Sequence, residues 1–173
     1  MVRRLSSLDH LSDGRVAWNV VSSYSKSEWD AYGAEMAPRA ERYDRMEEYL
    51  EICYQLWESW EPDAIIADKE SGVFADPAKV REVDYQGKYF SCKGRSFCFR
   101  SPQGRPVIWQ AGSSDRGRDF ASKHAEAIFA VHPTVDRMRE YADDLNDRLQ
   151  NRFHRPPGSV KLIYGLQCIV GET

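Results

Sequence analysis

One stretch, from Pro106 to Phe129, constrains the fold of this chain more than any other. The run Pro106–Gln110 is apolar and rich in β-forming residues, so it predicts a short buried strand. Four small residues follow, Ala111–Ser114, and the two serines among them are good candidates for a helix N-cap. From Arg118 to Phe129 the apolar residues recur at helical spacing. The stretch is therefore expected to form a strand, a tight turn and a helix in succession.

A turn of this kind is suited to binding phosphate. The first N–H groups of a helix have no partner within it, and this positive end attracts an anion. Gly112 and Gly117 would let the backbone approach a ligand closely, and the hydroxyls of Ser113 and Ser114 can donate hydrogen bonds to its oxygens. The alternative is an ordinary strand–helix turn that serine caps without any ligand.

The composition indicates a single globular domain. The chain has 173 residues, 42% of them hydrophobic, which suffices for one core. A net charge of −3 with a pI near 5.8 argues against a nucleic-acid-binding protein. No apolar run approaches the ~18 residues of a membrane span and the N-terminus lacks an apolar signal core, so we expect a cytoplasmic protein without membrane contact. The four cysteines form no CxxC pair, and no metal site is expected.

A second strand is predicted near the N-terminus, after a helical segment over residues 1–11. Residues Arg15–Val21 are apolar on both faces, as in a central parallel strand, except for Asn19. A polar residue near the C-terminal end of such a strand is where α/β sheets place ligand-binding groups. Asn19 is therefore a candidate binding residue, although it could equally cap neighbouring backbone. A polar loop is expected from Ser22 to about Ala40.

The clearest helix is predicted over Glu41–Trp60. Its apolar residues alternate steps of three and four and form one stripe, consisting of Tyr43, Met46, Leu50, Cys53, Trp57 and Trp60. The stripe is expected to face the core, while Tyr43 in the first turn could face a cleft. Four glutamates lie off the stripe and are interpreted as a solvated face, namely Glu47, Glu48, Glu51 and Glu58.

An insertion is expected at about 61–105, within a single domain over 1–173. It contains a predicted β-hairpin over Val83–Phe90, with a Gln-Gly turn, that Ser96–Arg100 continues. Such insertions often form a lid or one wall of a binding site.

The C-terminal third continues the alternation of strands and helices. Strands are predicted at Ala127–Val131 and Val160–Val170, with a helix at Val135–Phe153 between them that Thr134 caps. The apolar stripe of this helix consists of Met138, Ala142, Leu145 and Leu149. His124 falls on a helix stripe and is interpreted as structural, whereas His132 at a strand end is a candidate pocket residue. The alternation predicts an α/β fold with a parallel sheet. Four strands are too few to close a (β/α)8 barrel, which takes ~250 residues.

Four separated segments carry a resemblance that covers nearly the whole chain, from Leu5 to Gly171. They are Leu8–Ser23, Glu41–Arg45 with its helix, Val83–Phe90, and Gln110–Gly117 with its helix. In this order they resemble the bacterial-luciferase-like flavin monooxygenases. The matching branch contains nitrilotriacetate monooxygenase component A, the corresponding pristinamycin synthase component and dibenzothiophene-sulfone monooxygenase.

The resemblance implies a fold, a cofactor and a reaction. Members of the family are TIM-type (β/α)8 barrels, of which this chain would form about strands 4 to 7 with the β-hairpin insertion. They are flavin-dependent monooxygenases that use reduced FMN and O2 to oxygenate a small organic substrate, and a separate flavin reductase supplies the reduced FMN. The flavin carries the demanding chemistry, while the protein binds and orients it and excludes water.

The resemblance also implies a set of cofactor-binding residues, namely Asn19, Ser22, Tyr43, Gly112, Ser113 and Ser114. Ser113 and Ser114 would hold the FMN phosphate, with Gly112 allowing close approach. Asn19 and Ser22 would line the flavin pocket at the end of their strand. Tyr43 matches the tyrosine of a His-x-x-x-Tyr flavin pair, but Arg39 stands at the histidine position. A cation there either replaces the histidine contact, with reach to phosphate, or leaves it lost.

The resemblance further implies that the first three strands and the eighth strand of the barrel are missing. An incomplete barrel would expose unpaired sheet edges, which a homodimer would cover. The function is therefore expected to be that of the monooxygenase family. The alternatives are a catalytically inactive truncated homologue that retains at most a phosphate- or FMN-binding half site, and a generic α/β domain that binds a phosphorylated ligand. The identity of the catalytic residues and of the substrate is open at this stage.

Overall fold

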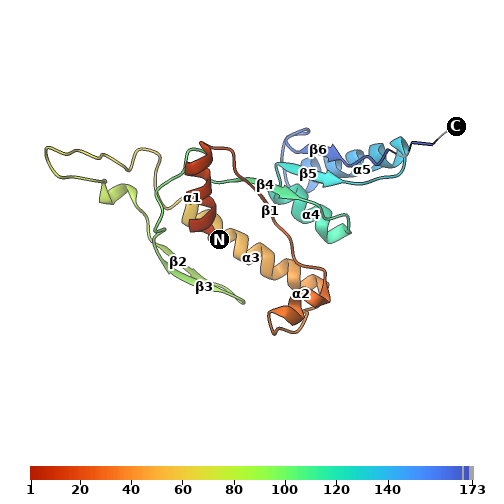
Figure 1. Cartoon of the computed structure of the whole chain (residues 1–173), viewed down its shortest axis with the longest axis horizontal. Helices are drawn as coiled ribbons and strands as arrows, with labels where there is room; N and C mark the ends of the chain where they lie inside the picture. The colour runs from red at the N-terminus through yellow and green to blue at the C-terminus, as the bar shows by residue number, and fades with distance from the viewer. Residues whose placement is uncertain (169, 172–173) are drawn as a thin grey trace. The chain divides into compact units, whose positions relative to one another are not determined.

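The computed structural model describes residues 1–168 and 170–171 (Figure 1). It comprises two compact units. The first consists of Met1–Trp18 and Met36–Pro106, and the second of Asn19–Glu35 and Val107–Thr173. Each unit is therefore assembled from two separate stretches of the chain.

Two helices form the core of the first unit. They are α1, Val2–Ser12, and α3, Arg39–Trp57. The predicted stripe on α3 is confirmed from Tyr43 to Trp57, because all five of its residues in that range are buried. The indole N–H of Trp57 donates a hydrogen bond to the Ser6 hydroxyl on α1 across 3.2 Å. Helix α3 ends at Trp57, so Trp60 lies beyond it and is only half-buried.

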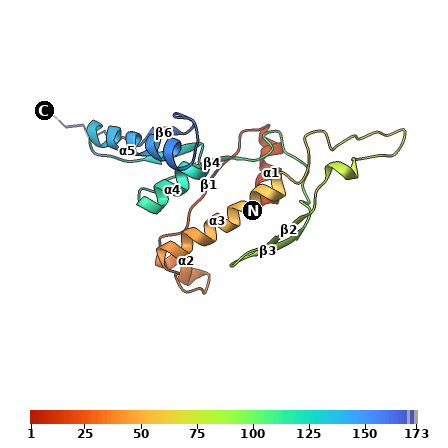
Figure 2. The same cartoon turned by 180° about the vertical axis from the view of Figure 1, so that it is seen from behind.

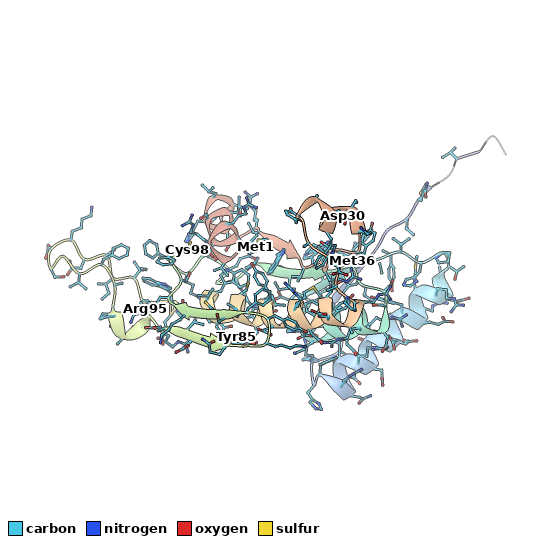
Figure 3. All side chains as sticks on the ribbon, turned by 90° about the horizontal axis from the view of Figure 1, so that it is seen from below. Met1, Asp30, Met36, Tyr85, Arg95 and Cys98 are labelled. Carbon is cyan, nitrogen blue, oxygen red and sulfur yellow. The ribbon has the colours of Figure 1, made fainter. Side chains whose placement is uncertain are left out.

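The predicted hairpin is confirmed in the first unit (Figure 3). Strand β2, Val83–Gln86, pairs antiparallel with β3, Ser91–Gly94, after a short 3-10 helix η1, Pro77–Lys79. The second strand is therefore Ser91–Gly94, and the predicted continuation over Ser96–Arg100 is wrong.

Glu48 holds the turn of this hairpin and does not belong to a solvated face, so that interpretation of Glu48 is wrong. Its carboxylate accepts hydrogen bonds from the backbone N–H groups of Lys88, Tyr89 and Phe90, the last at 2.7 Å. A Cβ atom at Gly87 would overlap the Glu48 carboxylate, so a larger residue there would displace the carboxylate from its place at the turn. Charge-assisted hydrogen bonds to backbone N–H groups explain why a glutamate can serve as the anchor of this turn.

A buried aspartate on α1 connects two distant loops of the first unit. Asp9 is fully buried and accepts hydrogen bonds from the Gln103 side chain at 2.6 Å, the Gln103 N–H at 3.1 Å and the Val16 N–H at 3.4 Å. Burial alone would raise the pKa of the Asp9 carboxyl, but the hydrogen bonds it accepts outweigh this and hold its pKa below the ordinary value. Asp9 is therefore ionised in the folded unit at neutral pH.

Replacing Asp9 with asparagine is expected to destabilise the protein by roughly 1.5–3 kcal/mol at pH 7, since an amide cannot accept from all the donors that face the carboxylate. The folded pKa lies below the unfolded value of ~3.9, so this stabilisation is present above that value and is lost as pH falls through the folded pKa. Chemical denaturation of both proteins from pH 7 to pH 2.5 should show the difference between them shrinking in acid. Asp13→Asn, at an exposed left-handed position, is the matched control and should change stability little. A stability difference between the two proteins that does not change with pH would contradict the lowered pKa of Asp9.

The second unit is built on a parallel sheet. Its strands are β1, Ala17–Asn19, where the chain passes from the first unit to the second, β4, Val107–Gln110, β5, Ala127–Ala130, and β6, Lys161–Tyr164. The order is β1-β4-β5-β6, and β5 pairs in parallel with both β4 and β6. Parallel neighbours joined through helices confirm the predicted α/β class.

Two helices cover one face of this sheet (Figure 2). They are α4, Asp115–His124, and α5, Val135–Asp147, which continues into one turn of π-helix, η2, Arg148–Arg152. The core between helices and strands consists of Ala121, Ala125, Ile128, Ala130, Tyr141, Leu145, Leu149 and Val160. Thr134 caps α5 as predicted, its hydroxyl accepting from the Arg137 N–H at 3.3 Å.

Several predicted boundaries in the second unit are wrong. The helix after Ala111–Ser114, called the serine turn below, ends at His124, because Ala125 is extended and the chain enters β5 two residues later. The loop after Ser22 contains a short helix, α2, Lys26–Ala31. On α5 the buried residues include Tyr141, while Met138 and Ala142 are only half-buried. The last strand ends at Tyr164; of its predicted range, Ile169 lies outside the described residues.

Across residues 1–168 and 170–171, none of the helices has the length and apolar character needed to cross a membrane. Within the same part of the chain, no three His, Cys, Asp or Glu side chains are grouped so that they could hold a metal ion.

Candidate functional site

The serine turn joins β4 to α4 in the second unit. Ser114 is the N-cap residue of α4, with extended backbone angles, and its hydroxyl oxygen accepts from the Gly117 N–H at 3.2 Å. The predicted N-cap is thus confirmed at Ser114. A hydroxyl that accepts in this way still has its own proton to donate. Ser113 is exposed and Ser114 is half-buried, so both hydroxyls lie at or near the surface of the turn.

Gln110 was predicted as the last residue of a strand and begins the fourth family motif, but it was not a site candidate; in the structure it organises this turn. Its side chain is buried, and its carbonyl oxygen accepts from the backbone N–H groups of both Ala111 and Gly112. The Gly112 N–H is therefore already engaged, and what Gly112 offers a ligand is room rather than a donor. A glutamine at a strand end is a common residue in a common place, so no sequence signal distinguished it.

The end of β1 lies beside the serine turn. The Val20 N–H donates to the Trp109 carbonyl at 3.0 Å, and the Gln110 amide donates to the Val20 carbonyl at 3.0 Å. Val20 directly follows Asn19 and precedes Ser22 by two residues. Asn19 is exposed and Ser22 is half-buried. The structure thus brings Asn19, Ser22 and the serine turn to the same end of the sheet.

Two further candidates lie on α3 in the first unit. Arg39 is the first residue of the helix and is exposed, whereas Tyr43, one turn later, is 7% exposed. Residues four apart share one face of a helix, so Arg39 and Tyr43 have the spacing of the His-x-x-x-Tyr pair. Burial of the Tyr43 ring accounts for its place in the apolar stripe, and its contact with a ligand stays a prediction.

His124 and His132, both in the second unit, pack against aromatic rings. The His124 ring lies 4.8 Å from that of Phe120, between ring centres, in agreement with a structural role. His132 lies 4.8 Å from Tyr141 and 6.0 Å from Tyr164 in the same measure. His132 therefore covers the end of the core formed by α5 and β6.

The whole chain matches one protein family. The sequence model for luciferase-like monooxygenases aligns with residues 2–173. The chain belongs to the luciferase-like monooxygenase family. This confirms the family that the four motifs indicated, and the second unit with its parallel sheet is part of the (β/α)8 barrel of these luciferase-like proteins.

Relatives in the luciferase-like family are considerably longer. A long-chain alkane monooxygenase from Geobacillus thermodenitrificans is 46% identical over 173 residues, covering 99% of this chain and 39% of the relative. Nitrilotriacetate monooxygenase component A from Aminobacter aminovorans is 33% identical over 174 residues, covering 100% of this chain and 38% of the relative, which confirms the branch. A crystal structure of riboflavin lyase with modified FMN and riboflavin matches with a TM-score of 0.93 at 40% identity, covering 98% of this chain and 38% of that protein. The chain thus spans about two fifths of the length of these luciferase-like relatives.

Proposed function

We propose that this chain provides the FMN phosphate site of a flavin-dependent monooxygenase, which uses reduced FMN and O2 to oxygenate a small organic substrate. The observation that carries the proposal is the serine turn at the N-terminus of α4. It combines an exposed serine, a capping serine with a proton to donate, and a run of small residues, beside the end of β1. A phosphate group fits such a turn because helix N-termini attract anions and the small side chains leave room for it.

Each candidate residue has a distinct task in this proposal. Ser113 and Ser114 would donate to the phosphate oxygens, and Gly112 would leave space for them. Asn19 and Ser22, at the end of β1, would line the flavin pocket next to the phosphate. Tyr43, on α3 of the first unit, is a further flavin-binding candidate through its place in the family motif. Bound reduced FMN supplies the electrons that activate O2, while the protein orients the cofactor and limits access of water.

The proposal includes three kinds of partner. A separate flavin reductase would deliver reduced FMN, consistent with a relative that is named as component A of a monooxygenase. The substrate would be a small organic molecule, since the named relatives act on an alkane and on nitrilotriacetate. Association of two copies would cover the open edges of the partial barrel.

The decisive experiment is a comparison of FMN with riboflavin, which differs from it only by lacking the phosphate. We expect quenching of flavin fluorescence by the purified chain, with tighter binding of FMN than of riboflavin. The mass of the protein should be recorded on the same samples, so that binding is assigned to a monomer or a dimer. Equal affinity for both flavins would remove the phosphate site from the proposal. A folded protein that binds neither flavin would support the inactive homologue instead.

A further inference from the structure

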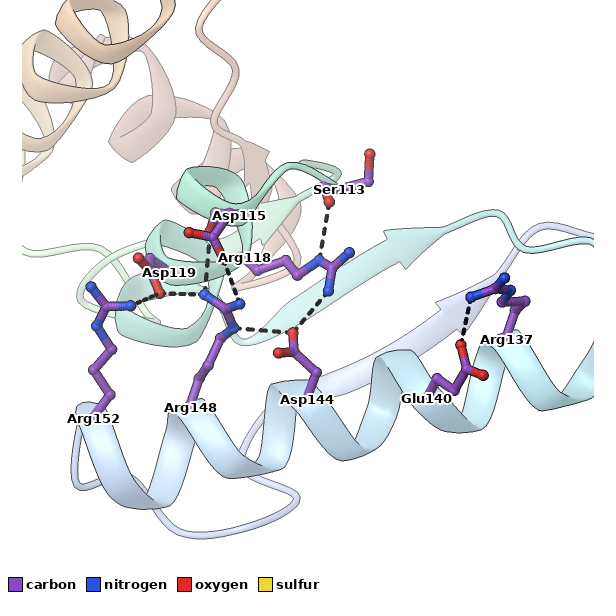
Figure 4. Close-up of polar contacts among 9 residues, drawn as sticks. All are labelled: Ser113, Asp115, Arg118, Asp119, Arg137, Glu140, Asp144, Arg148 and Arg152. Atoms are coloured by element: carbon purple, nitrogen blue, oxygen red, sulfur yellow. Dashed lines mark hydrogen bonds and ion pairs between the residues drawn. The ribbon is translucent and has the colours of Figure 1, made fainter.

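A network of alternating charges lies beside the serine turn, between α4 and the segment formed by α5 and η2 (Figure 4). Its centre is Arg148, the first residue of η2, whose side chain is only 14% exposed. The Arg148 guanidinium pairs with three carboxylates, those of Asp115 at 2.6 Å, Asp119 at 2.7 Å and Asp144 at 3.0 Å. Each of the three guanidinium nitrogens of Arg148 thus donates to α4 or to Asp144, a residue that contacts α4 through Arg118.

The network reaches the turn itself by two routes. Asp144 also accepts from Arg118 at 3.1 Å, and the Arg118 Nε donates to the backbone carbonyl of Ser113 at 3.0 Å. This route links Arg148 to the backbone of the exposed serine. On the second route Arg148 binds the side chain of Asp115, the residue that follows the capping serine Ser114. Arg148 is therefore linked to the Ser113 backbone through Asp144 and Arg118, and to the residue after Ser114 through its direct bond to Asp115.

Asp115 would oppose phosphate binding if it were not paired. Its carboxylate is one residue from Ser114, and a second negative charge so close to a phosphate would repel it. The hydrogen bond from Arg148 lowers the pKa of Asp115, as expected for a carboxylate held by a guanidinium. The three carboxylates are matched by three guanidinium groups, because Arg152 also pairs with Asp119 at 2.7 Å and Arg118 with Asp144. The paired groups of this network therefore carry no net charge.

We propose that Arg148 is a positioning residue for phosphate recognition. It neutralises Asp115 and, through Asp144 and Arg118, fixes the Ser113 backbone, so that both serine hydroxyls are oriented for an incoming phosphate. This inference rests on the function proposed above and specifies how the same site is held. Because Arg148 acts through residues of the serine turn and its neighbours, it would influence the phosphate of FMN and leave the flavin ring unaffected.

The test compares Arg148→Met with Arg152→Met, which removes the same charge from the next turn of the same segment. Of the three carboxylates in the network, Arg152 pairs with Asp119. The pairs of Asp115 and Asp144 with Arg148 and Arg118 stay intact when Arg152 is replaced. We expect Arg148→Met to weaken FMN binding by about tenfold or more and to leave riboflavin binding unchanged, while Arg152→Met changes either by less than about twofold. Arg148→Lys, which can retain one ion pair but not the three-way geometry, should fall between Arg148→Met and the parent protein.

Asp144→Asn supplies a second arm in case Arg148→Met does not fold. It removes the charge that holds Arg118 and so weakens the route to Ser113, while the pair between Arg148 and Asp115 stays in place. FMN binding should therefore weaken severalfold with riboflavin binding unchanged. Unaltered FMN binding in Asp144→Asn, or equal losses in Arg148→Met and Arg152→Met, would overturn the inference. A parent protein that does not prefer FMN over riboflavin would instead overturn the proposed function, so the two failures are distinguishable.

Discussion

Replacement of Ser113 and Ser114 together with alanine is expected to weaken FMN binding by roughly a hundredfold or more. Hydrogen bonds to a charged phosphate contribute roughly 1.5–3 kcal/mol each, and every ~1.4 kcal/mol is a factor of ten in affinity. The measurement is FMN titration followed by fluorescence, with riboflavin as the ligand that lacks the phosphate. Riboflavin affinity should be nearly unchanged, because neither hydroxyl has a phosphate partner there.

The matched control is a second pair of serines in the same unit. Ser25 and Ser27 lie at the start of α2 and are hydrogen-bonded to each other at 2.7 Å. Their double replacement with alanine also removes two hydroxyl groups, but at positions far along the chain from the serine turn. It should leave FMN affinity unaltered. Since Ser114 also caps α4, its loss costs about 1 kcal/mol of helix stability, and thermal melting of each variant separates this effect from ligand binding. An FMN affinity equal to that of the parent protein would remove both serines from the phosphate site.

Replacement of Trp57 with alanine is expected to destabilise the first unit by roughly 3–5 kcal/mol. The indole is 3% exposed, packs edge-on against Trp18 with ring centres 6.1 Å apart, and donates to Ser6. Removing it leaves a large cavity between α1 and α3 and an unpaired hydroxyl on Ser6. Chemical denaturation should show the loss as a lower midpoint at an unchanged slope.

Two further variants define what Trp57 contributes. Trp57→Phe keeps most of the ring and removes the indole donor, so it should destabilise the unit less than alanine does. Tyr32→Ala removes an aromatic side chain that is 88% exposed and should change stability by less than about 0.5 kcal/mol. A Trp57→Ala protein as stable as the parent would mean that the α3 stripe does not form the core.

Features that depend on a few neighbouring residues were predictable from the sequence. The strand before the serine turn, the N-caps at Ser114 and Thr134, and the apolar stripe of α3 all appear in the structure. Each depends on hydrogen bonds within one turn or on the spacing of apolar residues along one helix or strand, and both can be read from neighbouring residues in the sequence. The family was also recognisable, because four separated motifs occur in one order.

Features that depend on distant residues were missed. Glu48 looked like one of several solvated glutamates, yet it binds a turn some 40 residues later. Asp9 and Gln103 are 94 residues apart, and Arg148 meets Asp115 and Asp119 from another element. The spacing of polar residues along the sequence does not indicate which distant residue each one binds, so these contacts are seen only in the folded structure.

By itself the amino-acid sequence determined most of the longer helices and the strands of the parallel sheet, their order, the family and the serine turn that carries the proposed site. These follow from local hydrogen bonding and hydrophobic period, which act over a few residues. The tertiary structure alone decided which polar groups hold those elements, because a buried carboxylate or guanidinium is tolerated only where the fold supplies its partners. The physical reason is that desolvation makes each such group depend on contacts far along the chain, as Gln110, Glu48 and Arg148 do.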